Sequence, residues 1–413
     1  MIATQTIAQV VASQRGRLLD KELGQPRQIR DFGKLLAGLS SHALIVTGIR
    51  RCGKSTLMQQ VHATFSKDAI YLNFEDPRLA GFDLEDFNRL QTLAELQNVT
   101  AYFFDEIQNI AKWESFVRFR LDEGYTVFIT GSNAAILSKE LGTKLTGRHI
   151  SLELFPFSYL EYLEWVDEEA SPESAAGYMR IGGFPEFLKT QLPEVLVQMF
   201  NDILIRDIAV RYHLKQHKVL QQLAVWLASN VGKPITGNSL RKTFDIASSS
   251  TISEYLSYFT DAYLFFFLPK YSASAKAQLV NPKKVYCIDN GFIEVNSLSL
   301  NADNGRLLEN MVYMQLRRTT QEIFYFADKR ECDFVVFEKR KPKFVLQVCW
   351  QINEDNLTRE LQGLQEAMSF FGLNQGLIIT HNQADTFKVE NGTVDAIPFY
   401  EWASAQNLPG RHP

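Results

Sequence analysis

One short segment, GIRRCGKSTL at residues 48–57, has residue types and a spacing suited to holding phosphate groups. Gly48 is followed by four residues and then by Gly53, Lys54 and Ser55, and the apolar run ALIVT precedes it. Glycines allow a turn whose N–H groups face phosphate oxygens, and a lysine and a helix N-terminus add positive charge. The pattern predicts a P-loop in which Lys54 contacts the phosphates of ATP and Ser55 ligates Mg²⁺.

The predicted nucleotide-binding segment comprises the whole loop and the first helical residues after it. Its members are Gly48, Ile49, Arg50, Arg51, Cys52, Gly53, Lys54, Ser55 and Thr56. A chance glycine turn is the alternative. The apolar strand expected before the loop and the helix expected after it favour the P-loop.

Two adjacent carboxylates, Asp105 and Glu106, end the β-forming run AYFF at residues 101–104. Hydrolysis of a bound nucleotide needs such a pair at the end of a neighbouring strand, because positioning and electrostatics carry phosphoryl transfer. We expect Asp105 to hold Mg²⁺ through water and Glu106 to orient or deprotonate the attacking water. The alternative is two solvated carboxylates at a strand end, which the P-loop upstream disfavours.

Further polar residues follow the next expected strand, YTVFITGSN at residues 125–133, which ends in Thr130, Gly131, Ser132 and Asn133. These groups should lie at the same sheet edge as the P-loop, where a γ-phosphate sensor has to sit. Arg148 follows in LTGR, at the start of another expected strand. A guanidinium suits phosphate charge, although a salt bridge at the strand end is the plain alternative.

The chain resembles the AAA-type ATPases of bacteria and archaea that carry a C-terminal domain of uncharacterised function. The resemblance covers nearly the whole chain and is carried by GIRRCGKSTL, FFDEIQN, ITGSN, LTGR, LFPFSYLEYL, GGFPEFL, RDIAVRY, NPKKVYCIDNGF, GRLLENMVYMQLRR and ECDFVV. It implies an AAA-like fold in which Ser132 or Asn133 is the sensor. It also implies that Arg148 is an arginine finger offered to a neighbouring subunit of a homo-oligomer, either a ring or a filament.

A chain of 413 residues exceeds what one hydrophobic core usually organises, so several domains are expected. Strands alternate with helical patterns up to about residue 155, which predicts an α/β parallel sheet with its ligand at the carboxyl ends of the strands. We expect an AAA+-type P-loop ATPase domain at residues 1–155 and a helical lid or connector at 156–213. A winged helix-turn-helix at 214–270 and an α/β restriction-endonuclease-like domain at 271–413 follow.

The winged helix-turn-helix is predicted from three helical segments with short polar breaks between residues 214 and 270. Its third helix would present serines to a DNA groove, with two basic residues near the phosphates. The candidate contacts are Arg241, Lys242, Ser249, Ser250 and Ser253. A helical bundle used only for packing or subunit contacts is the alternative, since Glu254 on the same face would repel phosphate.

The last 140 or so residues resemble a restriction-endonuclease-like domain, with Glu309 on a helix and Asp333 at the start of a strand. An active nuclease of this fold carries an acidic residue and then a lysine on the next strand, beside Mg²⁺. This chain has Gln347 and Cys349 there. A neutral amide binds Mg²⁺ poorly, so we expect Glu309, Asp333 and Gln347 to be a relic site without nuclease activity.

Composition excludes some classes of protein. The formal net charge of −4 gives no overall attraction to nucleic acid or acidic lipid, so such binding needs a local patch. The four cysteines are far apart and form no C-x-x-C pair, which argues against zinc and against a disulfide framework. The most apolar stretch, AYLFFFL at residues 262–268, is too short to span a bilayer. We expect a cytoplasmic protein with no membrane association.

Taken together, the sequence predicts an oligomeric, Mg²⁺-dependent ATPase that couples ATP hydrolysis to the binding or remodelling of DNA. Two alternatives remain open. One is a metal-dependent nuclease gated by ATP, which the missing lysine argues against. The other is a nucleotide-dependent signalling switch that recruits protein partners, which the winged-helix pattern argues against less strongly.

Overall fold

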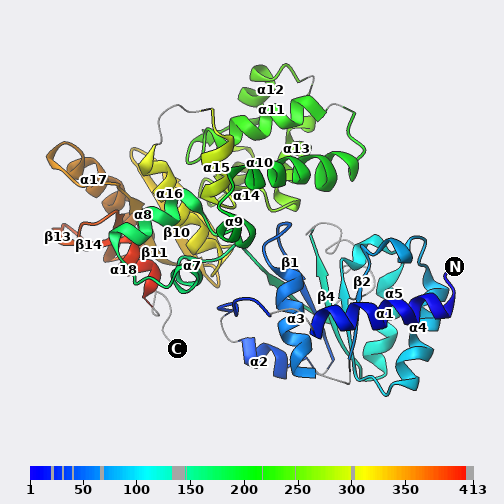
Figure 1. The fold of residues 1–413 in the computed structure, drawn as a ribbon. Coiled ribbons are helices and arrows are strands. Elements are labelled where there is room, and N and C mark those ends of the chain that lie inside the picture. Colours follow the sequence, from blue (N-terminus) through cyan, green and yellow to red (C-terminus); the bar gives the residue numbers. More distant parts are fainter. Residues whose placement is uncertain are drawn as a thin grey trace. The chain divides into compact units, whose positions relative to one another are not determined.

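The structure is a computed structural model of the chain. It describes residues 1–19, 23–29, 32–39, 41–65, 69–132, 145, 147–215, 217–246, 248–298 and 303–405. These residues form two compact units, Met1–Phe155 (unit 1) and Pro156–Pro413 (unit 2), and many of their elements are labelled in Figure 1. Within the described ranges, no helix is long and apolar enough to cross a lipid bilayer.

Unit 1 is built on a five-stranded sheet in the order β2-β3-β4-β1-β5, in which every pair is parallel. The strands are β1 (Ala43–Thr47), β2 (Ala69–Asn73), β3 (Ala101–Asp105), β4 (Thr126–Gly131) and β5 (His149–Glu153). Continuous burial along β1 and β3 agrees with the apolar runs in the sequence, since central parallel strands are covered on both faces. This is the parallel α/β P-loop sheet expected from the sequence.

Helices cover both faces of this sheet (Figure 1). Helix α3 packs against β3 and β4 on one face, whereas α1, α4 and α5 share a core with the other. The helical elements of unit 1 are α1 (Thr4–Leu19), α2 (Phe32–Ala37), α3 (Lys54–Phe65), η2 (Pro77–Leu79), α4 (Leu84–Leu96), η3 (Ile107–Asn109) and α5 (Trp113–Asp122).

Alternation along β3 divides its aromatic side chains between the two layers. Phe103 stacks on Phe128 of β4 at a centroid distance of 4.4 Å, on the face covered by α3. Phe104 belongs to the opposite core, where Phe87 of α4 and Phe116 of α5 stack at 4.5 Å. Burial of large aromatic rings on both faces therefore fixes β3, and with it the carboxylates that follow.

Unit 2 begins with helices α7 (Tyr159–Val166), α8 (Pro172–Ile181), α9 (Pro185–Thr190) and α10 (Pro193–Asp202), and α10 runs on into a π-helical turn, η4 (Ile203–Val210). Helices α8 and α10 both pack against α15 (Asn290–Asn296) later in the same unit. The segment expected to form a lid or connector therefore shares its packing with the C-terminal half of the chain.

A three-stranded sheet with four helices follows in unit 2. Its chain order is α11 (His217–Ala228), β6 (Pro234–Ile235), α12 (Gly237–Thr243), α13 (Ser249–Asp261), β7 (Phe265–Pro269), α14 (Ala275–Val280) and β8 (Lys283–Cys287). The strand order is β6-β8-β7, and both pairs are antiparallel. Strand β8 lies beyond residue 270, so this sheet extends past the boundary that the sequence suggested.

A six-stranded mixed sheet completes unit 2, in the order β13-β14-β12-β11-β10-β9. Helix α17 packs on β10, β11 and β12 through Leu364, Ala367 and Met368. The remaining elements are α16 (Asn304–Arg317), β9 (Ile323–Ala327), β10 (Glu331–Glu338), β11 (Lys341–Val348), α17 (Glu354–Phe371), β12 (Gln375–Thr380), β13 (Asp385–Val389), β14 (Gly392–Pro398) and α18 (Phe399–Ser404).

Two sequence motifs of unit 2, GGF and DNGF, meet at the Asp289 carboxylate. Its Oδ2 accepts a hydrogen bond from the Gly183 amide at 2.7 Å and its Oδ1 accepts one from the Gly291 amide at 2.9 Å. Burial raises the pKa of Asp289 to about 7. A Cβ atom on Gly183 would lie 2.1 Å from the Phe157 carbonyl oxygen, so only glycine fits at this junction.

We predict that Gly183→Ala destabilises unit 2 by about 1 to 3 kcal/mol or more, because the contacting atoms are backbone and cannot rotate away. Urea unfolding followed by circular dichroism measures the change. Gly237→Ala is the matched control: the nearest atom to its new Cβ, in Ile252, is 4.0 Å away, and its stability should change little. Equal losses in the two variants would contradict the packing described for Gly183.

Candidate nucleotide site and a second ionic cluster

The loop between β1 and α3 has the backbone conformation that a phosphate cradle needs. Gly48 and Gly53 have φ angles of 146° and 101°, which favour glycine. A Cβ atom on Gly48 would lie 2.0 Å from the Leu154 carbonyl oxygen, so a side chain there would collide with the backbone after β5. Helix α3 begins at Lys54, and Ser55 and Thr56 lie in its first turn. Unpaired amides of that turn can therefore face an anion.

Lys54 is the buried positive charge of the loop, with 5% of its side chain exposed. Its ammonium donates hydrogen bonds to the carbonyl oxygens of Gly48 and Ile49, both at 3.0 Å. The neighbouring Cys52 thiol donates to the Leu154 carbonyl at 3.3 Å, and burial raises its pKa. Arg50 pairs with Glu75 at 3.7 Å, and Arg51 has a φ of 63°.

A residue far from the loop in sequence, Arg27, also holds the loop in place. Its Nη1 donates to the Cys52 carbonyl and its Nη2 to the Phe155 carbonyl, both at 2.8 Å. One guanidinium thus ties the loop to the end of unit 1. The sequence analysis missed Arg27, because no local pattern marks a residue whose partners are 25 and 128 positions away.

The Asp105 carboxylate at the end of β3 is fully buried and enclosed by donors. Its Oδ2 accepts from the Tyr71 hydroxyl at 2.6 Å and from the Asn73 amide at 3.1 Å, and its Oδ1 accepts from the Thr130 hydroxyl. Burial, and then the Asp105 charge, raise the pKa of Tyr71, so Tyr71 stays a donor. Tyr71 and Asn73 were also missed, although a polar pair at the end of β2 is a usable signal.

Glu106 leaves β3 in a left-handed conformation with a φ of 54°, which turns its side chain away from the strand. Its carboxylate accepts from the Ser132 hydroxyl at 3.4 Å and from the Gln108 amide. Burial raises the pKa of Glu106; Lys54 opposes this shift and Asp105 adds to it. A carboxylate with a raised pKa is a better proton acceptor than an ordinary one, which suits a general base.

The residues predicted around the γ-phosphate fall in three places. Ser132 is buried directly after β4 and reaches Glu106, whereas Asn133 lies outside the described residues. Arg148 directly precedes β5, and its carbonyl accepts a hydrogen bond from the Ala43 amide at the start of β1. It therefore lies at the N-terminal ends of these strands, whereas the P-loop follows the C-terminal end of β1. It is exposed and forms a salt bridge with Asp122. Within one chain, Arg148 does not join the P-loop.

The residues at this edge fit a nucleotide with Mg²⁺. The glycine cradle would be filled by a Cβ atom, the Lys54 ammonium contacts only loop carbonyls among the described hydrogen bonds, and carboxylate and hydroxyl oxygens are the ligands that Mg²⁺ prefers. The loop amides and Lys54 would hold phosphates. Ser55 and, through water, Asp105 would hold the metal.

The predicted relic site in unit 2 is an ionic cluster around a lysine. The Lys284 ammonium of β8 lies 2.7 Å from Asp333 Oδ1, 3.1 Å from Glu309 Oε1 and 2.8 Å from Glu331 Oε1. Burial would lower the pKa of Lys284, but these carboxylates raise it well above its usual value. Among the described residues, no group of three or more potential ligands is arranged to hold a metal ion.

The other members of this cluster are also paired. The Tyr286 hydroxyl donates to Glu309 at 2.6 Å, and burial raises the pKa of Glu309 to about 7. The Gln347 amide oxygen accepts from the Asp333 amide at 3.1 Å, and its nitrogen donates to Glu360 at 2.8 Å. Lys284 was not predicted to belong to this cluster, because it lies 49 positions from Asp333.

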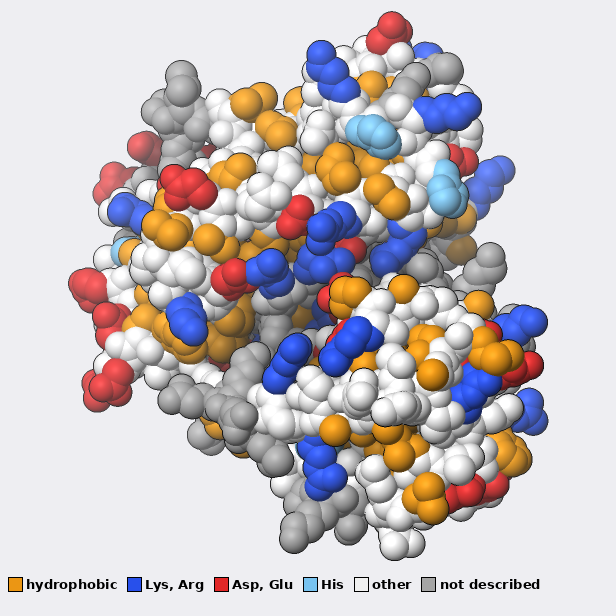
Figure 2. Space-filling model, turned by 45° about the vertical axis from the view of Figure 1, so that its right-hand side comes forward, with side chains coloured by type: hydrophobic (Ala, Val, Ile, Leu, Met, Phe, Trp, Pro, Cys, Tyr) orange, Lys and Arg blue, Asp and Glu red, His pale blue; other side chains and the backbone are white. Residues whose placement is uncertain are grey.

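Most of the predicted nucleic-acid contacts are at the surface of unit 2. Lys242, Ser249, Ser250 and Ser253 are exposed and Arg241 is half-buried, whereas α13 buries Ile252, Tyr255 and Phe259. On the face of the molecule drawn in Figure 2, Lys and Arg side chains (blue) lie among acidic (red) and hydrophobic (orange) ones. The charge on that face is therefore mixed, in keeping with the low net charge of the chain.

Comparison with known proteins gives matches over both halves of the chain. Residues 40–163 match a family described as an AAA domain, and residues 173–303 match a domain of unknown function, DUF8612. Among solved structures, the RuvB Holliday junction branch migration motor of Thermotoga maritima is 19% identical with a TM-score of 0.30, covering 58% of this chain and 86% of that one. The ADP form of the Aeropyrum pernix ORC2 protein is 13% identical with a TM-score of 0.32, covering 61% and 90%.

Curated relatives extend along most of the chain. An uncharacterized protein of Haemophilus influenzae is 29% identical over 333 residues, covering 75% of this chain and 83% of the relative. The uncharacterized protein MJ1544 of Methanocaldococcus jannaschii is 33% identical over 391 residues, which is 87% of each chain. The protein therefore belongs to the family of this Methanocaldococcus jannaschii protein and carries an AAA domain in its first unit.

Proposed function

We propose that the protein is an Mg²⁺-dependent ATPase that works as a homo-oligomer and couples ATP hydrolysis to the binding or remodelling of DNA. The observation that carries the ATPase part is the meeting of three groups at one sheet edge: the Lys54 loop, the enclosed Asp105 carboxylate and the Glu106 carboxylate of raised pKa. Binding alone needs only the first of these groups. A base of raised pKa beside an enclosed carboxylate supports turnover.

Each residue has a distinct part in this proposal. When a nucleotide binds, the Lys54 ammonium replaces its hydrogen bonds to loop carbonyls with contacts to phosphate oxygens. Hydrogen-bond donors hold the Asp105 carboxylate in place to receive a hydrated cation. Mg²⁺, when bound, neutralises developing phosphate charge. Glu106 accepts a proton from the attacking water, and Ser132 holds the Glu106 carboxylate in place.

In this proposal, the assembly of subunits completes the ATPase active site. Arg148 cannot serve the P-loop of its own chain, because it lies at the opposite sheet edge, but its guanidinium is exposed. An exposed arginine at that edge is available to the active site of a neighbouring subunit, as in enzymes that receive an arginine finger in trans. The alternative role of the Arg148 side chain is its salt bridge with Asp122.

The DNA-binding part rests on unit 2. The order from α11 to β8 is helix, strand, helix, helix, strand, helix, strand, and with the sheet order β6-β8-β7 it supports a winged helix-turn-helix in which α13 is the recognition helix. The mixed six-stranded sheet with α16 and α17 supports a nuclease-like domain. We propose that this domain is inactive, because the Lys284 ammonium already pairs with the carboxylates that a metal would need.

Glu106→Gln should bind ATP with near-normal affinity and lose turnover, because an amide cannot accept the proton, whereas Lys54→Ala should lose nucleotide binding. Equilibrium binding of a fluorescent ATP analogue and phosphate release measure the two properties. Glu95→Gln, a change to an exposed carboxylate near the end of α4, is the control and should keep both.

The wild-type rate should also fall with decreasing pH through a value above the ordinary glutamate pKa. Protonation removes the base, and burial raises the pKa at which this happens. Normal turnover by Glu106→Gln protein would rule out Glu106 as the base.

Arg148→Ala should bind ATP normally but hydrolyse it about 10³-fold more slowly or worse, even at concentrations where the subunits assemble. Asp122→Ala is the matched control, because it breaks the same salt bridge and keeps the guanidinium. Equal activities in the two variants would mean that Arg148 serves only that salt bridge.

Supercoiled plasmid incubated with the protein and Mg²⁺ or Mn²⁺ should stay intact, with or without ATP. Lys284→Met should lower the stability of unit 2, and the loss should grow from about pH 5 to about pH 8, because the Glu309 carboxylate, whose pKa burial raises to about 7, ionises over that range without its cation. Urea unfolding at the two pH values measures this. Nicking by the wild type that Asp333→Ala abolishes would establish the gated nuclease instead.

A further inference from the structure

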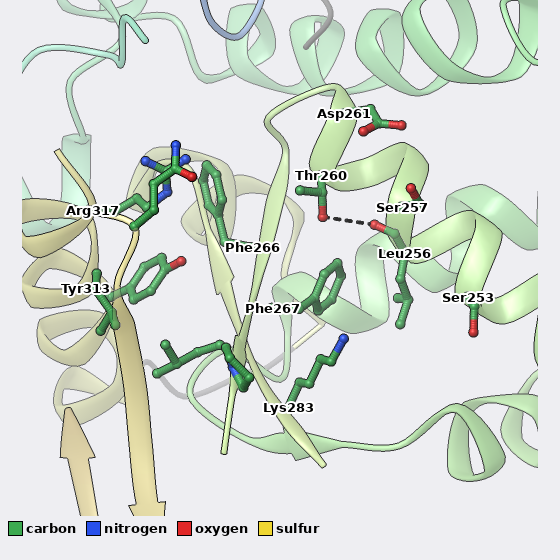
Figure 3. A pocket seen from close by; sticks show the side chains of 14 residues that line it. Ser253, Leu256, Ser257, Thr260, Asp261, Phe266, Phe267, Lys283, Tyr313 and Arg317 are labelled. Atoms are coloured by element: carbon green, nitrogen blue, oxygen red, sulfur yellow. Dashed lines mark hydrogen bonds between the residues drawn. The ribbon is translucent and has the colours of Figure 1, made fainter. Parts of the chain in front are cut away.

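Unit 2 contains a cavity of about 480 Å³ beside the proposed recognition helix, which neither the P-loop nor the Lys284 cluster uses. It is lined by α13, by β7 and the start of β8, and by the last turns of α16 (Figure 3). Its volume falls within the ~300 to 1,000 Å³ typical of sites for small ligands. Ser253, one of the predicted nucleic-acid contacts, is part of its lining.

The α13 wall of the cavity offers hydrogen-bond acceptors. Ser253 donates its hydroxyl proton to the Ser249 carbonyl and Thr260 donates its own to the Leu256 carbonyl, both at 3.1 Å. Their oxygens therefore face a ligand mainly with lone pairs. The Asp261 carboxylate adds a further acceptor to the same wall. A ligand group lying here should be a donor, such as an amino group.

Cations line other parts of the cavity. Figure 3 shows the Lys283 ammonium pointing into the space between β7 and α13. In the described part of the chain, no acidic group pairs with this ammonium. Arg317 of α16 also lines the cavity, with its guanidinium carbon 5.4 Å from the centroid of the Phe266 ring. Lys283 shares a face of the β7–β8 pair with Phe267, whereas Arg317 lies on the opposite face with Phe266. An anionic group, such as a phosphate, suits the Lys283 side.

An aromatic ring lies between the acceptors and the cations. Phe267 of β7 is half-buried, and its ring lies between the strand and α13 (Figure 3). Rings of this kind stack on unpaired bases in proteins that bind single strands. The cavity thus combines acceptors for an amino group, a surface for a flat ring and a cation for a phosphate.

We propose that this cavity binds an unpaired nucleotide of a DNA single strand, with its base against Phe267 and its phosphate near Lys283. The amino group of cytosine or adenine would donate to the α13 wall, so strands of these bases should bind better than thymine strands, which lack such a group. A duplex is excluded, because its base faces are stacked and its amino groups are paired. The inference rests on the proposed binding of DNA.

The test measures fluorescence anisotropy of labelled oligo(dC), oligo(dT) and a duplex with the full-length protein at two salt concentrations. Phe267→Ala should weaken oligo(dC) binding about tenfold or more, and Phe267→Tyr should retain it. Lys283→Gln should weaken binding and reduce the salt slope by about one. Lys276→Gln, on exposed α14 and outside the cavity, is the control and should change neither. Circular dichroism checks that each variant is folded.

The possible failures can be told apart. If the wild type binds DNA and both Phe267→Ala and Lys283→Gln bind equally well, the cavity is not the site, although DNA binding stands. If the wild type binds no nucleic acid, both the proposed nucleotide site in the cavity and the proposed DNA binding are wrong. Equal affinity for oligo(dC) and oligo(dT) would contradict the proposed hydrogen bond from the base amino group to the α13 wall. If free dCMP binds as tightly as oligo(dC), the ligand of the cavity is a small nucleotide and not a DNA single strand.

Discussion

Parallel pairing of the central strands in one register is the constraint on which the nucleotide site depends. Thr47 at the end of β1 is paired with Gly131 at the end of β4, and Asn73 at the end of β2 with Asp105 at the end of β3. The P-loop, the carboxylate pair and Ser132 therefore emerge at the same edge. Aromatic burial on both faces holds β3 in this register, so the packing of the core and the chemistry of the site have one origin.

The parts of the site that the sequence could predict are those whose signal is local. The P-loop spacing, the Asp105 and Glu106 pair after an aromatic strand and the polar end of β4 each occupy a few consecutive residues. The residues that support them could not be predicted, because they come from distant segments. Arg27 reaches the loop and Phe155, and Tyr71 reaches Asp105 across 34 positions. Such contacts exist only once the sheet has formed.

In unit 2, too, a residue from a distant segment could not be predicted from the sequence. The sequence indicated a nuclease-like site without its lysine, since Cys349 stands where that ammonium would be. The structure brings another lysine, Lys284, into the cluster from β8, between Glu309 and Asp333. Three carboxylates around one buried ammonium form an ion-pair cluster that holds β8, α16 and β10 together. The residues of the proposed relic site therefore have a structural role in unit 2.

We propose that ATP hydrolysis in unit 1 is coupled to DNA binding by unit 2, and steady-state ATP hydrolysis with a panel of nucleic acids tests that coupling most directly. The purified protein would be assayed alone and with duplex, single-stranded and branched DNA at two salt concentrations. The account predicts that one DNA structure stimulates turnover and that salt weakens the stimulation, since phosphate contacts are salt-sensitive. Turnover that is indifferent to every nucleic acid would contradict it and favour a switch that recruits proteins.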